Sequence, residues 1–246
     1  MENHKVVLMQ KADLKKKVVY DSVQRRYNAP NTYYRVQTND LISVRYQSLT
    51  AKDVDFFAQE TQANGATLNI GAGGNALLLG ELVDKDGSIP VPVIGKVKVA
   101  GMTVFEIQDM IQELANKYLD SPIVKVRLLN YRFTVLGEVL KEGTVYVGNN
   151  RVNMFEAMGL AGGLGDLADR GKIKLVRTDS AGVTTVQYIN LLDENFIMSP
   201  YYYVHQNDLL IVPPLRQRAY RKYFGPNLAL VLSSLSIVLL TINLTK

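Results

Sequence analysis

Residues 84–128 read DKDGSIPVPVIGKVKVAGMTVFEIQDMIQELANKYLDSPIVKVRL, and the hydrophobic period changes within this one stretch. Asp86-Gly87 predicts a turn, and the apolar residues that alternate with polar ones over residues 89–99 predict short strands. Pro90 and Pro92 lack the N–H group that a central strand donates. These strands are therefore expected at a sheet edge or at a bend.

A helix with one buried face is predicted next. Thr103 and Glu106 have the spacing of a capping box, in which each side chain accepts a backbone hydrogen bond at the start of a helix. Apolar residues then recur at helical spacing: Ile107, Met110, Ile111, Leu114 and Tyr118. The helix is expected to end by Asp120, and alternation returns over residues 124–128. Strands with one packed helix predict an α+β domain.

Upstream of this stretch the pattern is weaker. Residues 1–31 lack a sustained period and are expected to form an extended arm, whereas residues 33–46 predict two strands around an Asn39-Asp40 turn. Residues 64–78, NGATLNIGAGGNALL, are rich in glycine and asparagine. They lack the GxxxxGK spacing of a phosphate-binding loop, so they predict a plain loop and not a nucleotide site.

Downstream, a second unit repeats the combination of strands and one helix. Alternation predicts strands over residues 131–147 and 173–188. Asn153 caps a short helix with Glu156 at its third position, and Gly162-Gly163 end it. The second unit is therefore also expected to be α+β.

The turn before the last strand echoes the turn before the first. NDLLIVPP, from Asn207 to Pro214, is similar to NDLISV, from Asn39 to Val44. Both copies place a turn-forming Asn-Asp pair before a strand. Such turns are common, so the echo alone is weak evidence of a repeat.

The chain ends in an apolar segment that predicts a single C-terminal transmembrane helix. The 17 residues from Leu228 to Leu244 carry no charge, and as a helix they would span about 26 Å of a hydrocarbon core about 30 Å thick. The predicted lipid face is Leu228, Val231, Leu232, Leu235, Val238, Leu239 and Ile242. The residues expected to face neighbouring helices or water are Ser233, Ser234, Ser236, Thr241 and Asn243. The residues expected at the membrane interface are Arg216, Arg218, Tyr220, Arg221, Lys222 and Tyr223.

Composition narrows the classes of function. The chain has 246 residues, of which 47% are hydrophobic and 21% charged, and its net charge is +5. The basic excess suits anionic lipid better than nucleic acid, because no strand of basic and aromatic residues runs through the middle of the chain. The absence of cysteine excludes disulfides and thiolate sites. His4 and His205 lack metal-ligand spacing and are predicted to be surface residues, so we expect no metal and no cofactor.

These residues together resemble the polysaccharide export outer-membrane family, the Wza-type capsule exporters, from about Tyr33 to the end of the chain. The motifs of the family's export domain match Asp86, Gly87, Ile89 and Pro92, then residues 100–103, then Tyr118, Asp120, Pro122 and Val124. The motifs of its β-grasp module, the SLBB domain, match Gly137-Glu138-Val139, Ala161-Gly162-Gly163 and residues 208–213, beginning at Asp208. Two features depart from the family. Glu142 stands where proline is usual, and the usual second β-grasp module is absent.

The resemblance implies a domain order and an activity. The order is an extended arm (1–31), a polysaccharide export domain (32–129), an SLBB domain (130–215) and an interfacial segment with a transmembrane helix (216–246). Identical subunits would form a ring in contact with outer-membrane lipids, with a porin-like barrel of C-terminal helices and soluble domains in the periplasm. The ring would export capsular or extracellular polysaccharide received from an inner-membrane co-polymerase, so no catalytic residue is expected. Members are typically lipoproteins acylated at an N-terminal cysteine, and the resemblance implies a native lipoprotein in which Met1 here replaces that residue.

Other interpretations stay open. The tyrosines at residues 201–203 are candidates for stacking on sugar rings, although adjacent tyrosines more often pack or cover a sheet edge. The chain could instead be a tail-anchored module that binds polysaccharide or acts as a scaffold. It could also be a membrane-anchored enzyme that degrades polysaccharide, with Asp84, Asp86 and Glu138 as candidate carboxylates. Asp84 and Asp86 fit a turn, however, and Glu138 fits a family motif.

Overall fold

The structure is a computed structural model that describes residues 8–9, 25–30, 33–47, 80–179, 181–217 and 225–244. Its strands are β1 (Leu41–Gln47), β2 (Glu81–Leu82), β3 (Ser88–Val91), β4 (Gly95–Lys98), β5 (Ile123–Leu128), β6 (Arg132–Gly137), β7 (Gly143–Tyr146), β8 (Val152–Asn153), β9 (Ile173–Thr178), β10 (Thr184–Ile189), β11 (Tyr203–Val204) and β12 (Leu209–Val212). Its helices are α2 (Val104–Ala115), α3 (Met154–Leu160), the 3-10 helix η4 (Glu194–Met198) and α5 (Gly225–Leu244). The mixed α+β architecture predicted from the sequence is confirmed.

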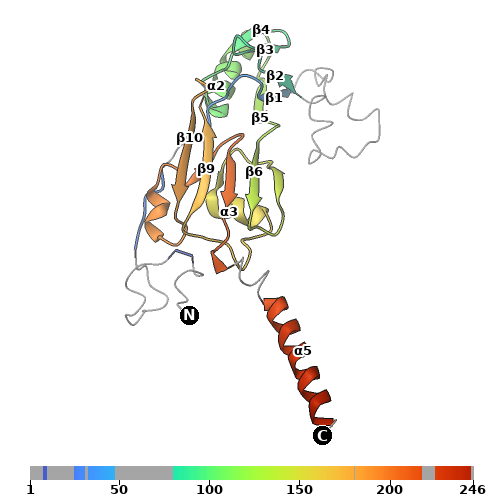
Figure 1. Ribbon diagram of the computed structural model, residues 1–246. Helices are drawn as coiled ribbons and strands as arrows, with labels where there is room; N and C mark the ends of the chain where they lie inside the picture. Colours follow the sequence, from blue (N-terminus) through green and yellow to red (C-terminus); the bar gives the residue numbers. More distant parts are fainter. Residues whose placement is uncertain are drawn as a thin grey trace, which may run out of the picture.

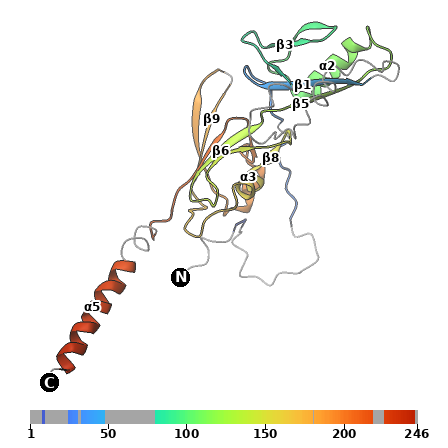
Figure 2. The ribbon, with the colours of Figure 1, turned by 90° about the vertical axis from the view of Figure 1, so that its right-hand side faces the viewer.

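Two β units, one above the other in Figure 1, form the body of the molecule. The first unit, residues 33–47 and 80–129, has the antiparallel sheet β2-β1-β5, the hairpin β3-β4 and helix α2. The second unit, residues 130–217, has the sheet β10-β9-β12-β6-β7, in which β12 is parallel to β6 and every other pair is antiparallel. Figure 2 shows that β5 of the first unit leads directly into β6 of the second.

Helix α2 begins where the sequence predicts. Thr103 Oγ1 accepts a hydrogen bond from the backbone N–H of Glu106 at 3.2 Å, and Glu106 Oε2 accepts one from the N–H of Thr103 at 2.7 Å. The buried face of the helix packs on β5 and consists of Val104, Ile107, Ile111 and Ala115. Tyr118 was predicted on this face but is 60% exposed, because the helix already ends at Ala115.

Helix α3 of the second unit is capped in the same way. Asn153 Oδ1 accepts from the N–H of Glu156 and Glu156 Oε2 accepts from the N–H of Asn153, both at 2.9 Å. The predicted end is also confirmed, since Gly162 and Gly163 follow the helix with positive φ angles of 80° and 98°. Local sequence rules therefore place both helix starts.

A continuous hydrophobic core joins the two units. Tyr131 and Phe133 lie just after β5 and are 1% and 0% exposed. The Tyr131 ring meets that of Tyr34 edge to face, with centroids 6.2 Å apart, and so ties the second unit to the first. Residues of both units belong to one buried cluster. The two units are therefore packed against each other through one shared hydrophobic core.

Residues 33–38 do not form the strand that their alternation predicts. Tyr34 and Val36 are buried, as expected, but the backbone of Val36 bonds to the loop before α2. Its N–H donates to Met102 O at 2.9 Å, and its carbonyl accepts from the N–H of Gly101 at 2.8 Å. The second predicted strand of the pair is present as β1.

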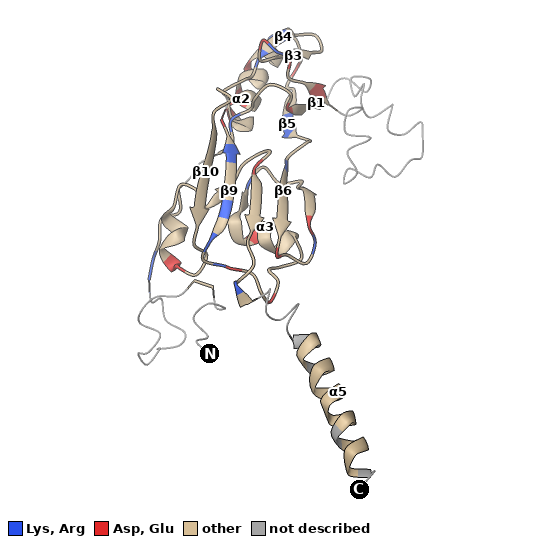
Figure 3. Ribbon diagram, in the orientation of Figure 1, with Lys and Arg blue, Asp and Glu red and all other residues tan. Residues whose placement is uncertain are grey.

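Helix α5 corrects the prediction for the C-terminal tail. It extends away from the two units in Figures 1 and 2 and carries no charged residue in Figure 3. Across the described ranges, however, no helix is both long enough and apolar enough to cross a membrane. The predicted transmembrane helix is therefore wrong.

The hydroxyl groups of α5 are satisfied within the helix. Ser233 Oγ donates to Leu230 O at 2.9 Å, and Ser236 Oγ donates to Leu232 O at 2.9 Å. Ser234 and Thr241 bond in the same way to carbonyls of the preceding turn. These contacts do not test the predicted division of the helix into a lipid face and a contact face, which stays a prediction. Every described side chain of α5 is exposed, and the side chain of Leu239 is outside the described set.

Candidate functional site

The Asp86-Gly87 turn of the first unit is organised by one lysine. Asp84 Oδ1 accepts from the backbone N–H groups of Asp86 at 3.0 Å and Ser88 at 2.9 Å. Lys96 Nζ lies 2.6 Å from Asp84 Oδ2 and 3.4 Å from Asp86 Oδ2. The hydrogen bond from Lys96, helped by the backbone donors, lowers the pKa of Asp84 below its ordinary value. Both carboxylates are thus engaged in shaping the turn.

This turn needs glycine because another motif lies against it. Gly87 has a φ of +78°, and a Cβ added to it would lie 2.5 Å from the Cβ of Ala100. The Gly87 carbonyl accepts from the N–H groups of Val99 and Ala100. The predicted motifs at residues 86–87 and 100–103 are therefore neighbours in space. Pro92 is exposed in the turn between β3 and β4.

The second unit brings its three predicted motifs together at the end of β6. Gly137 has a φ of +99°, and a Cβ there would lie 2.1 Å from Val212 O. The N–H of Glu138 donates to that same carbonyl at 2.9 Å. The N–H of Lys141 donates to Ala161 O at 2.9 Å. Residues 137–139, 161–163 and 208–213 thus form one contiguous region.

Glu142, which departs from the family pattern, has a local function in this region. Its Oε1 accepts a hydrogen bond from the backbone N–H of Gly137. The carboxylate therefore links the two ends of the turn between β6 and β7. A proline at position 142 has no side-chain acceptor and could not make this bond. In this chain the turn is therefore closed by the Glu142 carboxylate.

The two Asn-Asp turns have the same construction. Asn39 and Asn207 both have positive φ angles, 69° and 62°. Asp40 Oδ2 accepts from the N–H of Gln37 at 2.8 Å, and Asp208 Oδ2 accepts from the N–H of His205 at 2.7 Å. Asparagine tolerates this backbone conformation better than most residues. The sequence echo therefore corresponds to two copies of one turn.

The two turns meet between the units in a buried polar joint. We use this name for Tyr34, Asp40, Asn130, Tyr131, Arg177, His205, Gln206 and Asp208. Asn130 bridges the turns, because its Oδ1 accepts from the N–H of Leu41 at 2.9 Å and its carbonyl accepts from Gln206 Nε2 at 2.8 Å. The joint therefore fixes how the units meet.

Each turn aspartate has its own partner in the joint. Asp208 receives two hydrogen bonds from Arg177, from Nε at 2.9 Å and from Nη2 at 2.7 Å. The side chains of this pair are 0% and 16% exposed. Asp40 Oδ2 accepts from the hydroxyl of Tyr34 at 2.8 Å. Tyr131 donates its hydroxyl to the carbonyl of Val204.

Burial dominates the electrostatics of the joint. It raises the pKa of Asp40 and Asp208, against the opposing effect of their hydrogen bonds, and it raises the pKa of the Tyr34 and Tyr131 hydroxyls. It lowers the pKa of His205 to about 4, with a further contribution from the positive charge of Arg177. His205 was predicted at the surface, and this is wrong. Its Nε2 is buried and finds no hydrogen-bond partner among the residues that the structure describes.

Within the joint, His205 makes a contribution to stability that is lost in acid. His205 is neutral when folded, so its contribution to stability is fully present above its unfolded pKa of 6.5 and is lost as the pH falls towards about 4. We expect the free energy of unfolding to fall by about 1–2 kcal/mol more between pH 7 and pH 5 than in a His205→Asn variant. Urea titrations of both proteins measure this. Burial raises the pKa of Asp40 and Asp208, so their effect on the change of unfolding free energy with pH has the opposite sign. Both residues are present in both proteins, so their effect cancels in the comparison. Parallel pH profiles of the two proteins would contradict the prediction.

Aromatic side chains cluster beside the joint. The rings of Phe196 and Tyr202 lie 5.9 Å apart, and Tyr202 meets Tyr203 at 5.0 Å. The Arg151 guanidinium lies 4.4 Å from the centre of the Tyr203 ring. Two of the three adjacent tyrosines are therefore occupied in packing. Tyr201 packs against the core as well, and it also lines a cavity.

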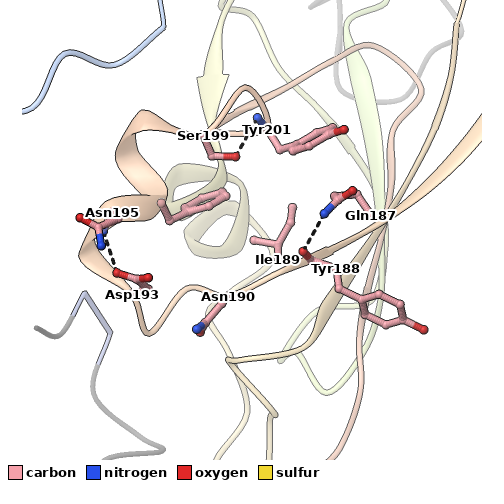
Figure 4. A pocket seen from close by; sticks show the side chains of 9 residues that line it. Gln187, Tyr188, Ile189, Asn190, Asp193, Asn195, Ser199 and Tyr201 are labelled. Carbon is pink, nitrogen blue, oxygen red and sulfur yellow. Dashed lines mark hydrogen bonds between the residues drawn. The ribbon is translucent and has the colours of Figure 1, made fainter. Parts of the chain in front are cut away.

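This cavity of about 240 Å³ lies between the end of β10 and η4 (Figure 4). Its lining residues are Gln187, Tyr188, Ile189, Asn190, Asp193, Asn195, Phe196, Ser199 and Tyr201. The chain reverses here, and Asp193 Oδ1 caps η4 by accepting from the N–H of Asn195 at 2.9 Å. Ser199 Oγ accepts from the N–H of Tyr201 at 3.2 Å. The cavity therefore combines amide and hydroxyl groups with aromatic rings.

Sequence reasoning missed most of this cavity. Asn190, Asp193 and Asn195 occur within six residues, and this density of capping residues was the available signal. Of the residues predicted at a membrane interface, Arg216 is exposed after β12. The others lie outside the described residues: Arg218, Tyr220, Arg221, Lys222 and Tyr223. So do the predicted glycine-rich loop at 64–78 and most of the arm at 1–31.

Comparison with known proteins bears on the first unit above all. Residues 28–129 match the family described as polysaccharide biosynthesis/export protein. A 157-residue stretch is 31% identical to the EPS I polysaccharide export outer membrane protein EpsA of Ralstonia nicotianae and 30% identical to that of Ralstonia solanacearum. The stretch covers 61% of this chain and 40% of each relative, so the chain spans well under two thirds of their length.

The comparisons agree with the resemblance drawn from the sequence motifs. Both relatives are named outer membrane proteins, in accord with the predicted location. The Asp86-Gly87 turn, the start of α2 and β5 all lie inside the matched residues 28–129. Over residues 28–129, the chain is similar to the family of polysaccharide biosynthesis/export proteins.

Proposed function

We propose that this chain is a subunit of an oligomeric outer-membrane channel that exports capsular or extracellular polysaccharide, with its folded units in the periplasm. The observation that carries the proposal is the match of residues 28–129 to the export family, together with relatives named for polysaccharide export. The lipid anchor and the inner-membrane co-polymerase implied by the resemblance belong to the same proposal. The chain would act as a conduit.

The state of the candidate carboxylates favours a conduit over an enzyme. A glycosidase needs two carboxyl groups that face one sugar, one of them able to give up a proton near neutral pH. Asp84 and Asp86 are both bound by Lys96, and the pKa of Asp84 is lowered. Glu138 lies at the end of β6, in the other unit. These residues are therefore poorly placed for acid and base catalysis.

We further infer that residues 32–129 are the export domain and residues 130–215 the SLBB domain. The mixed sheet β7-β6-β12-β9-β10, together with α3 packed beside the small sheet β11-β8, supports a β-grasp fold for the second part. So does the meeting of residues 137–139, 161–163 and 208–213, which carry the family motifs. The buried polar joint would hold the two domains in one fixed arrangement.

The edges of the second sheet support assembly with identical copies. β10 and β7 are its two edge strands, and neither contains a charged residue or a proline to block pairing. The pairing pattern makes β10 antiparallel to β7. If copies are related by rotation about an axis along the strands, β7 of one copy meets β10 of the next as an antiparallel pair. Such a head-to-tail contact closes into a ring.

Deletion of the gene in its natural host tests the export function. We expect polysaccharide to disappear from the cell surface and medium and to accumulate inside the cell envelope, because synthesis continues without an exit. The wild-type gene supplied in trans should restore secretion. Unchanged secretion in the deletion strain would refute the proposal.

The same complemented strain reports on assembly. Because the chain has no cysteine, a Thr144→Cys/Thr185→Cys variant places single thiols on β7 and β10. We expect mild oxidation to give a ladder of linked subunits. Thr184→Cys and Val186→Cys in place of Thr185→Cys cover neighbouring registers. An Asp109→Cys/Thr144→Cys control, with one thiol on α2, should stay monomeric. Equal cross-linking of all pairs would show that these edges are not the interface.

A further inference from the structure

We propose that the cavity between β10 and η4 is a binding subsite for one neutral pyranose unit of the exported polymer. The proposal rests on the export function and adds a site to it. The cavity belongs to the second unit, and its described lining residues all lie within 187–201, outside the segment that matches the export family. It is therefore a feature of this chain's own second domain.

The polar groups of the cavity match the hydroxyls of a sugar. A side-chain amide offers both a donor and an acceptor, which suits two adjacent hydroxyl groups. Asn195 is exposed, and among the described residues its amide group forms no hydrogen bond, so it is free to bind. Asn190 uses its Oδ1 to accept from the N–H of Leu192 at 3.0 Å, which fixes its orientation and leaves its amide N–H groups available.

The apolar groups of the cavity provide a surface for the C–H face of a pyranose. Ile189 and Phe196 are 2% and 8% exposed and form a rigid floor. The Phe196 ring is held edge to face by Phe155, at 6.1 Å, and by Tyr202, at 5.9 Å. Tyr201 adds a ring with a polar end. Aromatic rings that are already fixed bind with little loss of conformational entropy.

Size and charge narrow the ligand class. The volume of about 240 Å³ is below the range of about 300–1,000 Å³ typical of pockets for drug-sized ligands, so it suits a single ring. Among the described residues, no lysine or arginine lines the cavity, and Asp193 is its only charged lining residue. A uronic acid would bring its carboxylate close to that of Asp193, whereas a neutral hexose would not. The cavity therefore favours uncharged sugars.

Weak binding at such a site is compatible with transport. A conduit must bind its cargo strongly enough to admit it and weakly enough to release it. A small open cavity that contacts one ring of a long polymer meets this condition. The site would act as a guide for the passing chain and not as a point of permanent attachment.

Saturation-transfer NMR of the purified full chain tests the proposal, because the method detects weak ligands. The probes are methyl α-glucoside, methyl α-galactoside, methyl α-mannoside, N-acetylglucosamine and glucuronate. Since α5 exposes apolar side chains, a detergent without a sugar head group should be present. We expect a signal from at least one neutral probe, its loss in Asn195→Ala, and no signal from glucuronate.

Controls separate binding from folding. Asn195 is exposed, so the Asn195→Ala variant should keep the wild-type melting temperature. Asn149→Ala removes an exposed amide outside the cavity and should keep the signal. No signal from any neutral probe, a signal that survives Asn195→Ala, or equal binding of glucuronate would overturn the proposal. Failure of the export function would appear separately, as unchanged secretion in the deletion strain.

Discussion

Replacement of Asp208 by alanine should remove about 3–5 kcal/mol of folding free energy, a large part of the stability of an ordinary domain. The carboxylate is fully buried and receives both hydrogen bonds from Arg177, which is itself only 16% exposed. Its loss leaves a buried guanidinium without a counter-charge. It also leaves the backbone N–H of His205 without its acceptor. Urea unfolding of the variant and the wild type measures the difference.

Two comparisons show whether burial is the cause. Asp84→Ala removes a carboxylate that also pairs with a lysine, but on an exposed turn, so its effect should be much smaller. Asp208→Leu combined with Arg177→Met removes both charges from the joint and should recover most of the loss. If Asp208→Ala unfolds at the same urea concentration as the wild type, the joint does not hold the two units together.

Local rules account for the parts of the fold that the sequence predicts. Both capping boxes depend on residues three apart, Thr103 with Glu106 and Asn153 with Glu156, and both are present. The alternation of apolar and polar residues over 124–128 can also be recognised without knowledge of a distant partner. The predicted strand is confirmed as β5. Hydrophobic periodicity and helix capping depend only on residues close together in the sequence. These predictions are therefore confirmed by the structure.

Predictions that depended on distant contacts were less successful. The alternation at Tyr34 and Val36 correctly indicated burial, but the backbone of Val36 pairs with the loop before α2 and not with a strand. The tail formed a helix, as predicted, yet burial of its apolar side in a membrane was inferred from length and polarity alone. His205 was assigned to the surface because a sequence does not show that its ring would lie against that of Tyr34, in the other unit, or that Arg177 would lie near it.

The candidate sites show the same limit. The Asn-Asp echo was visible, but the partner of Asp208 is Arg177, 31 residues earlier in the chain. The cavity needs the end of β10, the cap of η4 and Tyr201 to converge, and each part looks like an ordinary turn in isolation. Motif matching located the turns that carry the family pattern. It could not locate a cavity made from residues that belong to no motif.

Replacement of Ile111 by aspartate should cost several kcal/mol and unfold most of the protein at 37 °C. Ile111 lies at the centre of the buried face of α2 and is 0% exposed. The surrounding core is apolar, so a carboxylate there would lose its hydration without gaining a partner. Thermal unfolding followed by circular dichroism measures the effect, and export should fail with it.

The pH dependence of this loss distinguishes a buried charge from a general packing defect. Burial raises the folded-state pKa of a carboxyl group above its unfolded value, so the loss should be full above the folded pKa and shrink as the pH falls through it. Ile111→Asn introduces a side chain with the shape of aspartate but without a charge. The loss of folding free energy in this variant should therefore not change with pH. Phe105→Asp makes a similar change on the half-exposed side of α2, where the loss should be small. A pH-independent loss in Ile111→Asp would mean that water reaches position 111 and that this face of α2 is not sealed against the sheet.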